Sequence, residues 1–184
     1  MSIPAYAFVN DLPAPVTTGT TIQSFTDVMG EVWVAKNGVN GGAWARARAV
    51  LYCRCYRGAA YNTPAGNSTF VYDTAVDDVY GMFANPGIAL PIPGSWMAGA
   101  SIEIVPTTAS DACAFYLNFG PNSFGSGSAT PNTVFNPIRA VYTVVGNVPT
   151  VPATVVVATE YMTVGRSVAN SDGRTILWAK YMGA

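Results

Sequence analysis

Apolar residues recur at every second position along most of this chain, and this alternation constrains its fold more than any other feature. In the segment WMAGASIEIV, every second residue from Trp96 to Ile104 is apolar. A β-strand places successive side chains on opposite faces of its sheet, so such a segment packs one face on a core. The 3.6-residue period of a helix is hard to find over more than one or two turns. The chain is predicted to be all-β.

Eight segments have this strand character, and turn signals rich in Gly, Pro and Asn separate them. The segments are 31–36, 47–56, 68–74, 96–105, 113–119, 133–145, 154–164 and 174–182. The Gly/Ser-rich segment 120–132 is expected to be a flexible loop tip. About eight short strands at this spacing fit a jelly-roll β-sandwich, although other Greek-key sandwiches share the same local pattern.

The 184 residues are enough for one domain with a full hydrophobic core. Residues 1–30 are rich in Pro and Thr and have weak strand character, so we expect an extended N-terminal arm there and the jelly-roll domain over 31–184. The arm is expected to lie along another molecule or to pair at a sheet edge, through Tyr6, Phe8, Val9 and Phe25. A ragged terminus is the alternative.

Charge is sparse in this chain. Apolar residues make up 50% of it and charged residues 10%, and the formal net charge is −1. This composition indicates either a large core or a surface that is partly buried against partners. We expect an oligomer.

The segment GGAWARARAVLYCRCYRGAA, residues 41–60, contains four of the nine positive charges. Read as one strand, it carries small apolar residues on one face and alternating aromatic and arginine residues on the other. Arginine and large aromatics are enriched at protein interfaces, so this second face is predicted to meet another chain. A solvated face with its arginines extended into water is the alternative. The predicted interface residues, with two from the last strand, are Trp44, Arg46, Arg48, Tyr52, Arg54, Tyr56, Trp178 and Tyr181.

The sequence contains no histidine, which removes the commonest general base and the usual zinc and iron ligands. Asp73, Asp77 and Asp78 could in principle form a carboxylate site or a calcium loop, but aspartate is also an ordinary turn residue. Cys53 and Cys55 lie on one face of a predicted strand and are interpreted as buried small residues rather than zinc ligands. We therefore predict no catalytic residue, no metal, no cofactor and no enzymatic activity.

Nucleic acids and membranes are not expected as partners. The sequence pI of about 5.2 and the scattered basic residues outside 41–60 do not give the positive field that phosphate binding requires. The long uncharged stretches are interrupted by Pro and Gly, unlike a membrane-spanning helix. The three cysteines cannot all pair within one chain, and they fit synthesis in a reducing compartment.

Four short motifs follow one another between residues 31 and 105. They are a Trp with a "YR-A-A" turn, a strand ending in Asp, an "Asp-x-x-Gly-Met-Phe" turn and a "P-x-x-G-x-W" strand entry. Their residues are Trp44, Tyr56, Arg57, Ala59, Ala60, Asp73, Asp78, Gly81, Met82, Phe83, Pro91, Gly94 and Trp96. In these residues, 31–105 resembles a module of virion surface proteins in tailed phages of actinobacteria. The latter half of this pattern is also similar to tumour-necrosis-factor-like and complement-like trimeric jelly rolls, and the likeness is looser over 106–184.

The resemblance implies a homotrimer of jelly rolls in which one sheet, with the last strand 174–182, faces the three-fold axis. It also implies a phage virion structural protein, made in the host cytoplasm and placed on the outer surface of the virion. Because the chain consists of the module and a short arm, we expect a capsid decoration protein that binds the major capsid protein. The alternatives are a receptor-binding module of a tail tip or fibre, whose partners are tail proteins or a host receptor, and a carboxylate-driven depolymerase.

Overall fold

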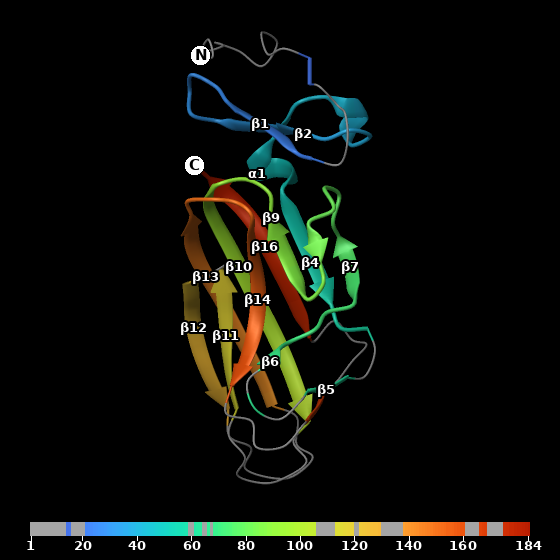
Figure 1. The fold of residues 1–184 in the computed structure, drawn as a ribbon, viewed down its shortest axis with the longest axis vertical. Coiled ribbons are helices and arrows are strands. Elements are labelled where there is room, and N and C mark those ends of the chain that lie inside the picture. The colour runs from blue at the N-terminus through green and yellow to red at the C-terminus, as the bar shows by residue number, and fades with distance from the viewer. Residues whose placement is uncertain are drawn as a thin grey trace.

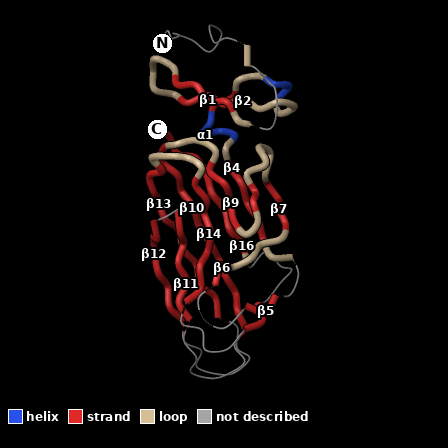
Figure 2. Tube along the Cα trace, viewed as in Figure 1, coloured by secondary structure: helices blue, strands red, loops and turns tan. Residues whose placement is uncertain are grey.

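A computed structural model gives the fold of this chain (Figure 1). It describes residues 14–15, 21–58, 61–63, 66, 68–105, 113–119, 122–129, 138–160, 166–168 and 175–184. The described chain is dominated by antiparallel strands, and its helical elements are confined to the N-terminal part (Figure 2). The all-β prediction is confirmed.

Two sheets stack to form the body of the molecule, and a third, smaller sheet lies at one end of it (Figure 1). The seven-stranded sheet contains β4 (Tyr52–Tyr56), β5 (Tyr61–Thr63), β7 (Thr74–Asp77), β10 (Gly94–Val105), β13 (Ile138–Val148), β15 (Arg166–Val168) and β16 (Ile176–Gly183). The six-stranded sheet contains β6 (Ser68–Thr69), β8 (Phe83–Ala84), β9 (Gly87–Leu90), β11 (Cys113–Phe119), β12 (Asn122–Ala129) and β14 (Ala153–Glu160). The small sheet contains β1 (Gln23–Thr26), β2 (Val32–Ala35) and β3 (Ala45–Arg46).

The order of the strands is that of a jelly roll. In the seven-stranded sheet β13 pairs with β10, β10 with β16, β16 with β4, and β4 with β7. In the six-stranded sheet the order is β12, β11, β14, β9 and β8. The hairpins β8–β9 and β11–β12 join consecutive strands, whereas pairs such as β10–β16, β16–β4 and β14–β9 join strands distant in sequence, as expected when strands alternate between two layers. The predicted jelly-roll sandwich is confirmed.

The core lies between the two sheets and follows the predicted alternation. Trp96, Ala98, Ala100 and Ile102 of β10 are all buried on its inward face. The Trp96 indole packs edge-on against the Tyr181 ring, with 5.2 Å between ring centroids, and its Nε1–H donates to the Ile92 carbonyl at 3.2 Å. Leu117, Phe119, Val155, Val157, Ile88 and Leu90 supply the facing layer from the six-stranded sheet. Burial of these side chains is the main source of stability.

The predicted strand 47–56 is wrong over its first half. Residues Ala47–Val50 form a single helical turn, α1, and the N–H of Leu51 donates to the Ala47 carbonyl at 2.8 Å. Alanine and arginine have high helix propensity, and the turn lets the chain change direction between β3 and β4. Only Tyr52–Tyr56 form the strand β4. The alternation read through 44–56 therefore does not describe one continuous face.

Two further predictions need correction. The Gly/Ser-rich segment predicted as a loop tip contains β12, which pairs with β11 from Cys113↔Ala129 to Phe119↔Asn122. Ladder hydrogen bonds with β11 outweigh the weak strand propensity of Gly and Ser. The predicted strand 68–74 is divided between the sheets, because β6 pairs with β14 whereas Thr74 begins β7 beside β4. Phe70 and Tyr72, between these two strands, are buried in the core.

Residues 23–26 of the predicted arm form β1, which pairs with β2 from Gln23↔Ala35 to Thr26↔Val32. A short 3₁₀ turn, η2 (Asn40–Gly42), leads from β2 to β3. The Phe25 ring packs against Trp44 with centroids 6.5 Å apart, so Phe25 contacts its own chain. This part of the segment is a hairpin and not an extended arm, because its backbone is paired within the small sheet. Tyr6, Phe8 and Val9 lie outside the described residues, and the division of the chain at residue 30 stays a prediction.

The close approach of β9 to β14 predicts the effect of a substitution at Gly87. A Cβ at this position would overlap the carbonyl oxygen of Val155 on the neighbouring strand. Because that atom is backbone, Gly87→Ala should separate the two strands and lower the free energy of unfolding by about 2 kcal/mol or more. Gly38→Ala is the control: its Cβ meets nothing within 4 Å and only its positive φ of 74° opposes the change, which should cost about 1 kcal/mol. Urea unfolding at one fixed protein concentration measures both, and equal losses would contradict this account.

Candidate functional site

The surface of the seven-stranded sheet that points away from the core is the candidate functional site, and we call it the outward face. Residues that pair across antiparallel strands share a face, so the register fixes its members. Gly99 pairs with Thr143 on one side and Trp178 on the other, and Trp178 pairs with Arg54. The outward face contains Tyr52, Arg54, Tyr56, Met97, Gly99, Ser101, Glu103, Val141, Thr143, Val145, Ile176, Trp178 and Lys180.

Large apolar side chains on the outward face are open to solvent. Val141 and Val145 are 64% and 62% exposed, and they are carried by β13. Met97, Ile176 and Trp178 are half-buried on the neighbouring strands. Contiguous exposed apolar surface of this kind marks a contact site for another macromolecule.

Gly99 makes the middle of the outward face flat. A Cβ at this position would lie 2.6 Å from the Trp178 ring, so the absence of a side chain lets the indole lie down on β10. An aromatic side chain that covers a glycine on the neighbouring strand is a known stabilising arrangement in sheets. The result is a broad, low apolar surface rather than a ridge.

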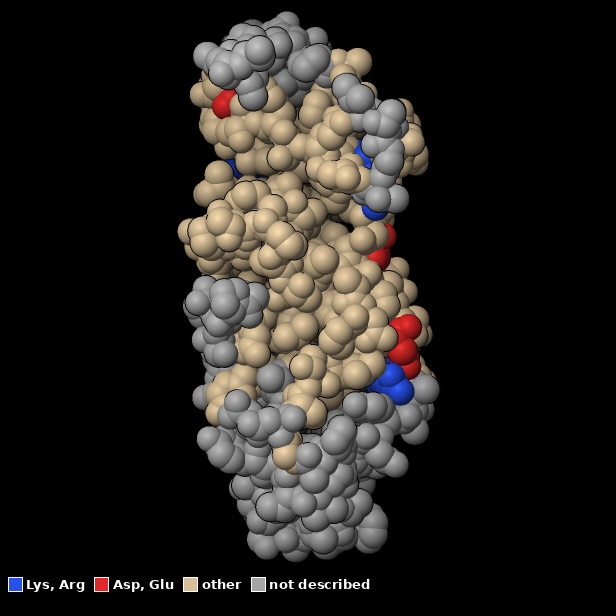
Figure 3. Space-filling view, in the orientation of Figure 1, with Lys and Arg blue, Asp and Glu red and all other residues tan. Residues whose placement is uncertain are grey.

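The charged groups of the outward face are Arg54 of β4, Lys180 of β16 and, toward the other end of β10, the buried Glu103, which pairs in the strand register with Arg139 of β13. Arg54 Nη2 pairs with Asp77 Oδ2 at 3.0 Å in an exposed ion pair, which contributes little to stability. Arg54 Nε is buried and finds no hydrogen-bond acceptor within the described part of the chain. Burial raises the pKa of Tyr52, so this phenol is neutral at physiological pH. Figure 3, seen from the side of the six-stranded sheet, shows charged atoms at the upper end of the molecule and along the margin where β4 and β7 lie.

The structure places four of the eight predicted interface residues, Tyr52, Arg54, Tyr56 and Trp178, together on the outward face. Tyr181 does not belong to it, because its ring packs on Trp96 in the core and only 1% of the residue is exposed. The sequence also gave no indication of Met97, Val141 and Val145 as members. The alternation over 138–148 could have shown which side chains share a side, but only the strand pairing shows which side points outward.

The other three predicted interface residues, Trp44, Arg46 and Arg48, lie with the small sheet and α1. The Arg46 guanidinium lies over the Trp33 ring, 5.5 Å from its centroid, and Arg48 Nε is 3.6 Å from Glu31 Oε1. The helical turn α1 separates these residues from β4, which is why they do not continue its face. They hold the small sheet together instead.

The aspartate cluster consists of turn-forming and ion-paired residues. Asp73 accepts hydrogen bonds from the Gly58 N–H at 2.7 Å and the Thr74 hydroxyl at 2.9 Å, and it pairs with Arg57 at 3.3 Å. Asp78 accepts hydrogen bonds from the N–H groups of Met82 and Phe83. Gly81, directly before Met82, has a φ of +63°. Asp73, Asp78 and Gly81 therefore build the turns at the two ends of this segment.

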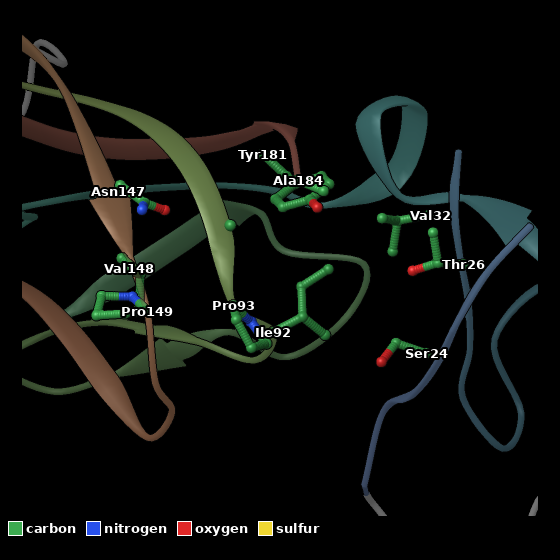
Figure 4. A pocket seen from close by; sticks show the side chains of 11 residues that line it. Ser24, Thr26, Val32, Ile92, Pro93, Asn147, Val148, Pro149, Tyr181 and Ala184 are labelled. Atoms are coloured by element: carbon green, nitrogen blue, oxygen red, sulfur yellow. The ribbon is translucent and has the colours of Figure 1, made fainter. Parts of the chain in front are cut away.

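Two cavities adjoin the small sheet. The larger, of about 390 Å³, separates Ser24, Thr26 and Val32 of the small sheet from Ile92, Val148 and Tyr181 of the sandwich (Figure 4). The second, of about 260 Å³, is lined by Lys36, whose Nζ donates to the Tyr80 carbonyl at 2.6 Å. Neither brings a carboxylate side chain or a thiol together with a base. Within the described residues no group of three or more Cys, Asp or Glu residues could hold a metal ion, and no helix is long and apolar enough to cross a membrane.

Comparison with known proteins identifies the architecture. The fold is a TNF-like jelly roll. Eiger, a TNF from S. frugiperda, superposes with a TM-score of 0.55 at 8% identity, covering 72% of this chain and 93% of its own. Murine APRIL at pH 8.0 superposes with a TM-score of 0.53 at 7% identity, covering 71% of this chain and 98% of its own. No protein-family model and no curated protein matches the sequence. At such low identity the likeness extends to the fold alone.

The two cysteines of β4 are predicted to be chemically inert in the folded protein. Both are buried free thiols, as the sequence indicated, and burial raises the pKa of Cys55 to about 12 and that of Cys53 further still. Since the thiolate is the reactive form, iodoacetamide at pH 8 should leave both unmodified in native protein and alkylate both in urea. Peptide mass spectrometry reads each cysteine separately. Rapid native alkylation of either one would contradict the burial of the inward face of β4.

Proposed function

We propose that this chain is a phage virion structural protein that decorates the outer surface of the capsid as a homotrimer. The observation that carries the proposal is the outward face, an exposed apolar surface on a TNF-like jelly roll. The resemblance of residues 31–105 to a virion surface module supports the phage assignment. The proposed role is mechanical: the trimer binds shell subunits and stabilises them by burying surface.

A closed trimer is the arrangement that best uses the outward face. Three copies related by a three-fold axis bury the same patch on each subunit and leave no copy of it open, which avoids filament growth. Val141, Val145 and Trp178 would then lose their contact with water, while the ion pair of Arg54 with Asp77 would lie closer to the rim.

The proposed role requires no chemistry of its own. The sequence contains no histidine, and the carboxylates of Asp73, Asp77 and Asp78 are engaged in turns and ion pairs. These contacts favour a structural role over the depolymerase alternative. A non-enzymatic protein of this kind would have the major capsid protein as its partner and would be found on the virion surface.

A substitution that introduces a charge on the outward face tests whether the protein is a trimer. Val145→Glu brings three carboxylates close together at the proposed axis without touching the core, so the trimer should dissociate. Light scattering after size-exclusion chromatography measures the molar mass, which should be about three times the 19.3 kDa of one chain for the wild type and that of a single chain for the variant. Val79→Glu, at a residue that is 66% exposed and outside the outward face, is the matched control and should remain trimeric. A wild-type monomer at micromolar concentration would overturn the trimer.

The location on the capsid is tested by the amount of protein in purified particles. Quantitative mass spectrometry gives the copy number of this chain relative to the major shell protein. A large, fixed fraction is expected, because decoration occupies repeated lattice sites. A few copies per particle would instead place the protein at the tail or at a single vertex and support the receptor-binding alternative. Absence from the particles would overturn both.

A further inference from the structure

The turn between β1 and β2, residues 27–30, displays two apolar side chains in solvent. Val28 is 51% exposed and Met29 is 84% exposed, the highest value among the large hydrophobic residues that the structure describes. The turn belongs to the small sheet at the end of the sandwich, and neither residue is part of the outward face (Figure 1). Trimerisation through the outward face therefore does not explain it. We call residues Asp27–Gly30 the hairpin tip.

The hairpin tip is held in one conformation by Asp27. Its Oδ1 accepts hydrogen bonds from the N–H groups of Met29 and Glu31, both at 2.9 Å, and its Oδ2 accepts from Trp33 Nε1 at 3.0 Å. The N–H of Asp27 donates to the Glu31 carbonyl, and the N–H of Gly30 to the Asp27 carbonyl, each at 3.0 Å. Gly30 has a φ of +77°, which closes the turn at little steric cost. One carboxylate thus fixes the backbone from which both apolar side chains project.

A preorganised turn with exposed apolar side chains has the physical properties of a docking element. Its conformational entropy is lost when the protein folds, so binding does not have to order it again. Anchor side chains that enter a pocket on the partner typically carry most of the binding energy of an interface. Met is well suited to this role, because its unbranched side chain adapts to irregular pockets.

We propose that the hairpin tip inserts Val28 and Met29 into a preformed apolar pocket of a second protein, the shell protein of the proposed function, on which this inference rests. The acidic neighbours are already engaged, since Asp27 accepts three hydrogen bonds and Glu31 is 3.6 Å from Arg48. The Asp27 carboxylate accepts these bonds from neutral N–H groups and keeps its negative charge, so the pocket is expected to be apolar where the two side chains enter and to carry no acidic group at its opening. A lipid surface is disfavoured, because two side chains bury little apolar area and two acidic residues flank them without an adjacent cluster of basic residues.

Binding to purified shells that lack this protein tests the proposal. The full-length wild type and the double variant Val28→Ser/Met29→Ser are titrated onto the shells, and the bound fraction is measured by co-sedimentation. The double variant should raise Kd by about tenfold or more, because it removes both apolar anchors. Val79→Ser, at a residue that is 66% exposed on another turn, is the matched control and should stay within about twofold of the wild type. Circular dichroism and light scattering confirm that each variant keeps its fold and its oligomeric state.

A third variant tests the contribution of the fixed turn conformation separately from that of the two apolar side chains. Asp27→Ala keeps Val28 and Met29 but removes the hydrogen bonds that fix the turn, so it should weaken binding by a smaller factor than the double variant. Vesicles of phosphatidylcholine with phosphatidylglycerol form a second arm of the assay, and no binding to them is expected. If the wild type binds the vesicles and the double variant does not, the partner of the hairpin tip is a lipid surface and the proposed protein pocket is wrong.

The outcomes distinguish this inference from the proposed function. If the wild type binds shells and the double variant binds equally well, the docking inference is wrong and the proposed function stands. If the wild type does not bind shells at all, the proposed function fails and the docking inference fails with it. Loss of binding by the Val79→Ser control to the same degree as the double variant would also overturn the inference, since the effect would then not be specific to the hairpin tip.

Discussion

The pairing of β16 with both β10 and β4 is the constraint on which the rest of the structure depends. Residues 176–183 lie between two strands that precede them by a long stretch of sequence, at Ser101↔Ile176 on one side and Tyr56↔Ile176 on the other. The seven-stranded sheet is therefore incomplete until this segment is in place. Such non-local pairing has a large loop-closure cost, which the buried side chains of the inward face must offset.

The strand β16 also links the core to the candidate interface. Leu177, Ala179 and Tyr181 point inward and are buried, whereas Trp178 lies on the outward face over Gly99. A shift of β16 along its neighbours would exchange these two sets of side chains, since the side-chain period of a strand is two. The packing of Tyr181 on Trp96 therefore fixes the register that places Trp178 outside. Core packing and the shape of the interface are set by the same pairing.

The sequence predicted the fold class and the strands whose alternation is strong, such as β10 and β11, because burial on one face leaves a clear period of two. It also predicted that Cys53 and Cys55 are buried, since small apolar residues share their side of the strand. The candidate site was predicted only in part. Four of the eight proposed interface residues share the outward face, and three others, Trp44, Arg46 and Arg48, were assigned by reading one period through a helical turn.

The remaining differences have physical causes that local sequence does not contain. The strand β12 is rich in Gly and Ser and exists because β11 offers it a complete hydrogen-bonding edge. Met97, Val141 and Val145 belong to the outward face only because β10 and β13 pair as they do. Both facts depend on which strands meet. Tyr181 is the exception, because the alternation itself places it opposite Trp178: the two are three positions apart, and on the inward face Tyr181 pairs with Trp96 and packs on its ring.

The two proposed contact surfaces differ in a way that suits their roles. The outward face is broad and flat. A closed three-fold arrangement would bury it completely, so it would not be available to contact another protein. The hairpin tip is small and projects from the end of the sandwich, so a trimer would present three identical tips. Each tip would bury too little apolar surface for tight binding alone, but three tips on one rigid body would bind a lattice of repeated pockets with high effective concentration. Trimerisation would thus convert a weak anchor into stable attachment, which makes the outward face a condition for docking as well as for assembly.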